Sequence, residues 1–134
     1  MMSVAPVLVI GCGGETMEAV LATIRKCGLR AVHCADLSEA RTLMAQEDFG
    51  AVFCSDTLLA GNSGALIRTL RESGPAAPVI ILSHFADWDA YLTAIGAGAF
   101  DFIACPPDPK ETERILWAAL QESSSMHRMA HASA

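Results

Sequence analysis

Short apolar runs alternate with amphipathic helical stretches along this 134-residue chain, and the alternation occurs five times. Each run is bounded by glycine, proline or polar residues, which is typical of a strand buried on both faces. Strands that alternate with helices build a parallel sheet covered by helices. Hydrophobic residues make up 52% of the chain and charged residues 18%, which suits such a covered sheet. The sequence therefore predicts an α/β fold.

The five predicted strands follow from the apolar runs and the turn residues around them. They are Val7–Ile10, 29–34, Ala51–Ser55, 79–82 and 100–104. Asp36, Asp87 and Asp108 each precede a helical stretch and are predicted N-caps. A glutamate three residues after the first and the last of these completes a capping box.

The chain has the length of a single domain that can bury one core without disulfides or metal. Apolar periodicity continues through the last predicted helix, which ends near Gln121, and is lost beyond it. Residues 1–121 are therefore predicted to form one domain, and residues 122–134 a polar C-terminal tail or linker.

The charge balance excludes several classes of partner. The formal net charge is −6, and no cluster of lysine and arginine is present, so no nucleic-acid or anionic membrane surface is expected. No apolar run approaches the roughly 20 residues that span a bilayer, and the N-terminus lacks a signal-peptide pattern. A cytoplasmic protein is expected.

The cysteine pattern does not indicate a disulfide framework. The five cysteines are an odd number and contain no CxxC pair, so buried free thiols are expected instead. They are Cys12, Cys27, Cys34, Cys54 and Cys105.

Three stretches of the chain resemble a known family. The most specific is residues 78–106, with the sequence PVIILSHFADWDAYLTAIGAGAFDFIACP. The second, AVFCSDTLLAGNSG, contains Asp56 and, eight residues later, Gly64 at the end of an expected loop. The third is VLVIGCGGE, at the first predicted strand. From about Val7 to Leu120, the chain resembles a response-regulator receiver domain of two-component signalling.

The resemblance implies a flavodoxin-like (βα)5 doubly wound sandwich, with a five-stranded parallel sheet in the order 2-1-3-4-5 and helices on both faces. It also implies a phosphorelay signal-transduction module rather than an enzyme. In this topology the carboxyl ends of the strands converge at one edge of the sheet, near a topological switch point. Cys12, Asp56, Ser83 and Cys105 are expected to face that edge.

The resemblance also assigns roles to individual positions. Asp56 stands at the phosphoacceptor position, Ser83 at the position of the hydroxyl that follows the phosphoryl group, and Phe102 at the position of the switch aromatic residue. Three residues depart from the family pattern at the expected site: Gly11 and Cys12 replace an acidic pair, and Cys105 replaces a lysine. Ala60 also replaces a proline, which affects the expected shape of the following loop.

These departures predict a degenerate receiver, or pseudo-receiver. Receiver phosphorylation resembles other phosphoryl transfers, which depend on positioning and on charge neutralisation by Mg²⁺. Mg²⁺ prefers oxygen ligands, so Asp56 without the acidic pair is expected to bind it weakly or not at all. No cofactor and no metal site are expected, and the predicted function is a phosphorylation-independent protein-interaction module.

A partner protein is expected, whether a histidine kinase, an output domain or a second copy of the chain. By resemblance, the partner surface comprises the predicted helix 87–97, the strand 100–104 and the last predicted helix. Trp117 does not fit the buried stripe of that last helix and is a candidate for this surface.

A nucleotide- or anion-binding regulatory domain is the first alternative. Gly11, Gly13 and Gly14 lie between the first strand and the first helix, where backbone N–H groups could receive a phosphate. Asp36 follows the second strand, as in a dinucleotide-binding fold, but Thr16 occupies the place of the third motif glycine.

A thiol- or metal-based sensor is the second alternative. It would gather Cys12, Cys105, His84 and Asp56 at the edge of the sheet as ligands. The predicted strand order separates Cys12 from Cys105 by roughly 14 Å, too far for a disulfide. Cys12 and Cys34 end neighbouring predicted strands and are the better pair, although a cytoplasmic setting disfavours a stable bond.

Overall fold

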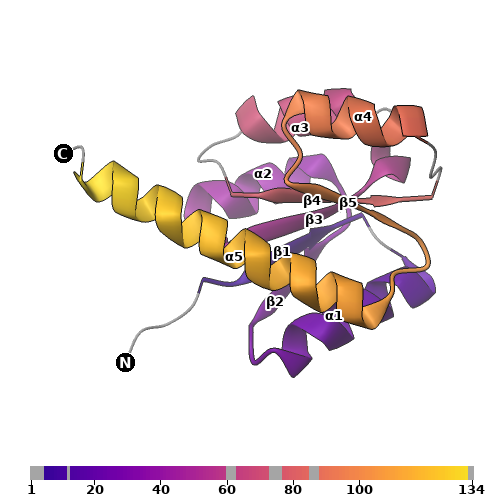
Figure 1. The fold of residues 1–134 in the computed structure, drawn as a ribbon, viewed down its shortest axis with the longest axis horizontal. Coiled ribbons are helices and arrows are strands. Elements are labelled where there is room, and N and C mark those ends of the chain that lie inside the picture. Colours follow the sequence, from indigo (N-terminus) through magenta and orange to yellow (C-terminus); the bar gives the residue numbers. More distant parts are fainter. Residues whose placement is uncertain (1–4, 12, 60–62, 73–76, 85–87, 133–134) are drawn as a thin grey trace.

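The computed structural model describes residues 5–11, 13–59, 63–72, 77–84 and 88–132. They form a five-stranded parallel sheet in the order β2-β1-β3-β4-β5, with helices on both faces (Figure 1). This confirms the predicted fold class and strand order. The strands are β1 (Val7–Ile10), β2 (Ala31–Cys34), β3 (Ala51–Ser55), β4 (Val79–Ser83) and β5 (Asp101–Ala104).

The helices divide into two layers. The layer that packs on one face contains α1 (Gly14–Lys26) and α5 (Pro109–Ala132). The layer on the opposite face contains α2 (Leu37–Gln46), α3 (Ser63–Glu72) and α4 (Trp88–Ala97), and a short 3-10 helix, η1 (Asp56–Leu59), follows β3. The loop expected to end at Gly64 ends earlier, because α3 already begins at Ser63.

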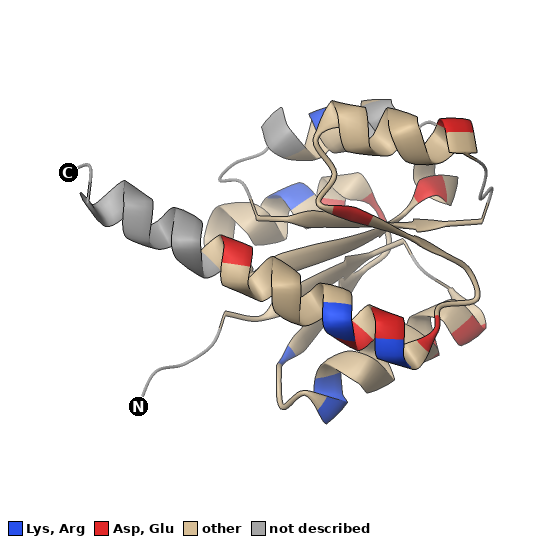
Figure 2. Cartoon of the chain, viewed as in Figure 1, with Lys and Arg blue, Asp and Glu red and all other residues tan. Residues whose placement is uncertain are grey.

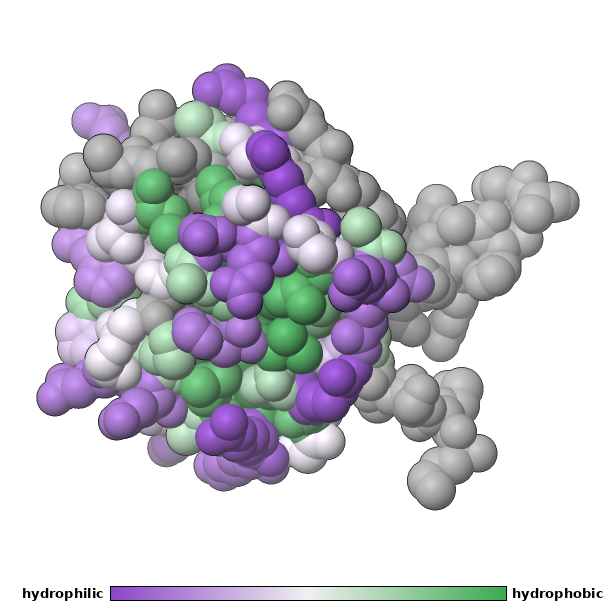
Figure 3. All heavy atoms as spheres, turned by 180° about the vertical axis from the view of Figure 1, so that it is seen from behind, coloured by the Kyte–Doolittle hydropathy of each residue, from purple (hydrophilic) through white to green (hydrophobic). Residues whose placement is uncertain are grey.

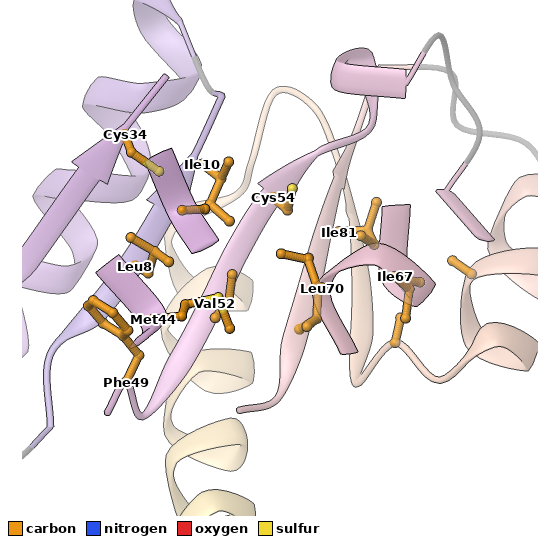
Figure 4. Close-up of a cluster of buried hydrophobic side chains, with 14 residues drawn as sticks. Leu8, Ile10, Cys34, Met44, Phe49, Val52, Cys54, Ile67, Leu70 and Ile81 are labelled. Atoms are coloured by element: carbon orange, nitrogen blue, oxygen red, sulfur yellow. The ribbon is translucent and has the colours of Figure 1, made fainter. Parts of the chain in front are cut away.

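Each face of the sheet has its own apolar core, because successive side chains of a strand point to opposite faces. Leu8 and Ile10 of β1 pack toward α2 and α3, whereas Val7 and Val9 pack toward α1 and α5. Figure 4 shows the first core, in which strand side chains meet Ile67 and other apolar residues of the covering helices. Burial on both faces explains why the apolar runs of the sequence are continuous instead of alternating with polar residues.

Two of the predicted helix caps are present. The Oδ1 atom of Asp36 accepts a hydrogen bond from the N–H of Glu39 at 2.9 Å. The Oδ2 atom of Asp108 likewise accepts from the N–H of Glu111 at 2.9 Å. Asp87, the third predicted cap, lies outside the described residues.

β2 is shorter than predicted, because the turn that ends α1 extends to Leu29, the first residue of the expected strand. Gly28 adopts a φ of +77°, and its N–H donates to the carbonyl of Arg25. The N–H of Leu29 donates to the carbonyl of Ile24, which completes a Schellman motif. Strand pairing therefore begins only at Ala31.

The predicted end of the last helix near Gln121 is wrong. α5 continues to Ala132 and extends past the sheet in Figure 1. No glycine or proline interrupts the sequence after Pro109, so the backbone can stay helical after the apolar periodicity ends. The division into a domain of residues 1–121 and a tail of residues 122–134 stays a prediction.

The charged residues are mixed over the surface. Figure 2 shows basic and acidic residues interspersed, with both signs along α1 and the start of α5. On the side of the molecule that faces away in Figure 1, apolar areas are interrupted by polar side chains (Figure 3). In the described part of the chain, no helix combines the length and hydropathy needed to cross a bilayer.

Replacement of Ile81 by alanine should lower the free energy of unfolding by about 2–5 kcal/mol, because the side chain is fully buried between β4 and the helices above it. Leu92→Ala is the matched control, since Leu92 is 48% exposed and should cost less than about 1 kcal/mol. Urea unfolding followed by circular dichroism measures both values. Equal losses would contradict this description of the core.

Candidate functional site

The carboxyl ends of the strands bring the predicted site residues to one edge of the sheet. Gly11 follows β1, Asp56 follows β3, Ser83 ends β4 and Cys105 follows β5. The register of β3 with β4 sets Asp56 beside Ser83. Cys12, also predicted at this edge, lies outside the described residues, as does Ala60.

Asp56 is a buried carboxylate with hydrogen bonds to both oxygens. Its side chain is 1% exposed. Ser83 Oγ donates to Oδ2 at 2.7 Å, and the N–H of His84 donates to Oδ1 at 3.1 Å. The imidazole Nδ1 of His84 lies 3.6 Å from Oδ1 and carries a positive charge only when protonated. These contacts offset the cost of burying the carboxylate.

A pair of hydroxyl groups shapes the turn that follows β3. The Oγ of Ser55 and the Oγ1 of Thr57 lie 2.8 Å apart in a hydrogen bond. The N–H of Thr57 also donates to Ser55 Oγ at 3.3 Å. This local bonding fixes η1 and, with it, the direction of the next side chain, Leu58.

Leu58 closes the space above Gly11. Gly11 has a φ of +67°, a conformation that residues with a Cβ rarely adopt. A Cβ atom at this position would lie only 2.5 to 2.7 Å from three side-chain carbons of Leu58. Leu58 itself packs against the apolar core beneath α2 and α3. Any side chain at position 11 therefore requires Leu58 to move.

Cys105 presents a neutral thiol at the end of β5. The side chain is half-buried, and burial raises the pKa of the Cys105 thiol. A hydrogen bond with Thr16 at the start of α1 opposes this increase, and the negative charge of Asp56 adds to it. The thiol therefore remains protonated near pH 7 and supplies no positive charge.

Comparison with known proteins identifies the family. The family model of the response regulator receiver domain matches residues 8–116. The chain belongs to the response regulator receiver domain family.

Curated relatives and solved structures agree with this assignment. The receiver domain is 26% identical over 120 residues to the response regulator protein PilR of Pseudomonas aeruginosa, covering 90% of this chain and 27% of PilR. It is 39% identical over 70 residues to the two-component response regulator PhoP of the same species, covering 52% of this chain and 31% of PhoP. A response regulator structure from Thermotoga maritima has a TM-score of 0.77 at 25% identity, covering 87% of this chain and 98% of that one. The chain thus spans less than a third of the length of these two curated relatives.

Phe102 of the receiver domain belongs to an aromatic stack that leads from the sheet to the solvent. Its half-buried ring and the ring of Tyr91 form an edge-to-face contact, with ring centroids 5.8 Å apart. Tyr91 in turn stacks on Trp88, at 5.3 Å. Trp88 is 70% exposed at the start of α4.

Trp117 lies on the side of α5 that faces α1. It is 43% exposed, and its side chain hydrogen-bonds with the Cys27 thiol just after α1. Glu113, one turn earlier on α5, pairs with Lys26 of α1 at 3.9 Å. Trp117 therefore lies partly exposed at the contact between α5 and α1.

The ligand-loop alternative stays a prediction. Gly13 and Gly14 are exposed at the start of α1, as a phosphate-binding loop would require. The carboxylate of Asp36, however, already caps α2. Asp36 therefore has a structural role in the absence of any bound ribose.

The thiol and metal alternative stays a prediction, because Cys12 lies outside the described residues. Among the described residues, no group of three His, Cys, Asp or Glu side chains could hold a metal ion. Cys34 is 1% exposed, and burial raises the pKa of its thiol to about 11, with Glu39 and Asp36 contributing further. A protonated, buried thiol is a poor ligand and a poor nucleophile.

Leu58 and the N–H of His84 were absent from the predicted site. An apolar residue three positions after a strand has no distinctive pattern, and a backbone N–H is present at nearly every residue. Only the positive φ of Gly11, which the sequence partly indicates through its glycine, points to the close approach of Leu58.

Gly11→Ala should destabilise the domain by more than about 1 kcal/mol, because it combines an unfavourable φ with a clash. Gly14→Ala is the matched control for the φ effect, since Gly14 has a φ of +54° and nothing within 4 Å of the added Cβ. Gly11→Ala should therefore cost more than Gly14→Ala in urea unfolding. Adding Leu58→Ala should cost less in the Gly11→Ala variant than in the wild-type chain. Additive effects would mean that Leu58 does not close this space.

The domain should lose stability between about pH 9 and pH 11, in part through Cys34. Its thiol ionises near its ordinary value of 9.0 in the unfolded chain and near 11 in the folded one. The unfolded state therefore releases the proton first, and the free energy of unfolding falls by up to about 1.4 kcal/mol per pH unit in this window. Cys34→Ala should show a shallower fall in urea titrations at pH 8, 9, 10 and 11. Parallel curves would contradict the prediction.

Proposed function

We propose that this receiver domain is a phosphorylation-independent interaction and regulatory module of a two-component pathway. The observation that carries the proposal is the packing of Leu58 over Gly11, next to the carboxyl end of β3. This apolar contact supports the proposal, because the side chain of Leu58 packs closely at a place where a cation site would need polar groups.

The donor atoms near Asp56 support weak or absent binding of Mg²⁺. Receiver phosphorylation needs a cation that bridges the acceptor carboxylate and the phosphoryl oxygens. Gly11 offers no side-chain oxygen, and Leu58 occupies the space that a side chain at position 11 would need. Both oxygens of Asp56 are already hydrogen-bonded to protein groups. The described residues do not fit an octahedral oxygen site.

The charges near Asp56 also support a phosphorylation-independent role. A phosphoryl group on Asp56 would bring further negative charge into a buried position. Cys105, at the position of the family lysine, is a neutral thiol. The imidazole of His84 lies near the carboxylate, but it offers a compensating charge only when protonated. The modified state would therefore lack a permanent cationic partner.

The partner surface that we propose comprises α4, β5 and α5. Trp88 and Leu92, which are 70% and 48% exposed, provide apolar area on α4. Large exposed side chains of this kind are enriched in protein interfaces. A histidine kinase, an output domain or a second copy of the chain could bind there, in keeping with the expected cytoplasmic location.

Incubation with Mg²⁺ and acetyl phosphate should leave the intact mass of the protein unchanged. Beryllofluoride with Mg²⁺ should likewise leave the amide chemical shifts around Asp56 and Ser83 unchanged. A receiver domain that retains the acidic pair and the lysine is the positive control. A phosphoryl adduct that forms rapidly and disappears in Asp56→Asn would refute the proposal.

A further inference from the structure

The solvent-facing side of α1 carries its charges in two separate groups. Glu15 and Glu18 lie in the first half of the helix, Arg25 and Lys26 lie in its last turn, and all four are exposed. Ala22, between the two groups, is also exposed. Residues three and four positions apart share one face of a helix. These five residues, the α1 stripe, therefore form one row that is acidic at one end and basic at the other.

A second copy of the chain matches the α1 stripe when the two α1 helices run antiparallel. With Ala22 of one copy facing Ala22 of the other, Glu18 of each copy lies opposite Arg25 and Lys26 of the other copy. This contact between opposite charges occurs twice, because a two-fold interface uses the same patch on both subunits. The small side chain of Ala22 at the centre allows the two helices to approach closely.

The charge of the whole chain favours this face for self-association. Two chains that each have a formal net charge of −6 repel one another, so a shared interface needs a region without net negative charge. α1 contains two acidic and two basic residues. Residues 109–117 of α5, which packs beside α1, add two of each sign (Figures 1 and 2). The whole net negative charge therefore lies outside these two segments.

Trp117 of α5 provides an apolar contact at the basic end of the α1 stripe. Its side chain is 43% exposed and hydrogen-bonds with the thiol of Cys27, the residue that follows Lys26. Tryptophan side chains are enriched at protein interfaces, where they contribute a large share of the binding energy. A second copy that packs on the α1 stripe would cover the part of this indole that one chain leaves exposed.

We propose that the α1 stripe and Trp117 form a self-complementary surface, through which two copies of the chain associate with their α1 helices antiparallel. The proposal goes beyond the proposed function. It does not depend on whether Asp56 carries a phosphoryl group, and it uses neither of the exposed apolar residues of α4, Trp88 and Leu92.

Sedimentation equilibrium of the full chain, without Mg²⁺ or a phosphodonor, tests the proposal. The wild-type chain should dimerise with a dissociation constant of about 10–100 μM, as expected for a small interface. Glu18→Arg sets like charges opposite one another at both contacts, and so does Arg25→Glu. Each variant alone should therefore weaken dimerisation by at least about tenfold. An equimolar mixture of the two variants should associate like the wild-type chain, because the two changes complement each other at both contacts.

Two further variants control for net charge and test the apolar contact. Arg68→Glu on α3 is the matched control, since it changes the net charge as Arg25→Glu does, at an exposed arginine outside the α1 stripe. It should leave the dissociation constant close to that of the wild-type chain. Trp117→Ala should weaken dimerisation at every salt concentration. The wild-type dimer should also weaken as salt is added, because salt screens the charge pairs. Circular dichroism during urea unfolding checks that each variant is folded.

Three results would overturn the proposal: a wild-type chain that stays monomeric up to about 1 mM, charge variants that dimerise like the wild-type chain, or a mixture that does not restore association. Loss of the dimer in Trp88→Ala or Leu92→Ala, with Glu18→Arg unaffected, would place the second copy on α4 instead. The proposed function fails separately, through a phosphoryl adduct on Asp56, and that result does not affect the outcome of the charge exchange.

Discussion

Parallel pairing of β3 with β4 determines the arrangement at the carboxyl edge of the sheet. Ser55 lies opposite Leu82, so Asp56 and Ser83 end at the same level and their side chains can meet. The strands can hold this register because both faces of the sheet are covered, and a slip of one residue would exchange the two apolar cores. The contact between Asp56 and Ser83 is thus a consequence of core packing rather than of local loop geometry.

The sequence was most informative where apolar runs end at distinct turn residues. The predicted bounds of β1 and β3 agree with the structure, and the caps at Asp36 and Asp108 are present. β2 was predicted too long because the Schellman motif after α1 includes Leu29, an apolar residue that resembles the start of a strand in the sequence. The end of α5 was misplaced because helix propensity does not require an apolar face.

The sequence predicted which residues lie near one another at the candidate site, but not the contacts between them. Strand order shows that Asp56, Ser83 and Cys105 share one edge, but hydrogen bonds depend on side-chain rotamers and on the short turn after β3. The contact between Leu58 and Gly11 joins a loop residue to a glycine of positive φ, and sequence spacing carries no information on such a contact. Replacement of buried charges by well-packed apolar groups is often neutral or stabilising. The domain can therefore lose ionic groups at this edge and keep its fold.

The length of α5 has a mechanical consequence. Its 24 residues span about 36 Å, whereas a four-residue strand of the sheet spans about 13 Å. A continuous helix bends little, so a tilt at one end also moves the other end. A tilt of about 10° around the Pro109 end would displace the Ala132 end by about 6 Å. A small rearrangement where α5 meets the sheet therefore produces a larger displacement at the far end of the helix.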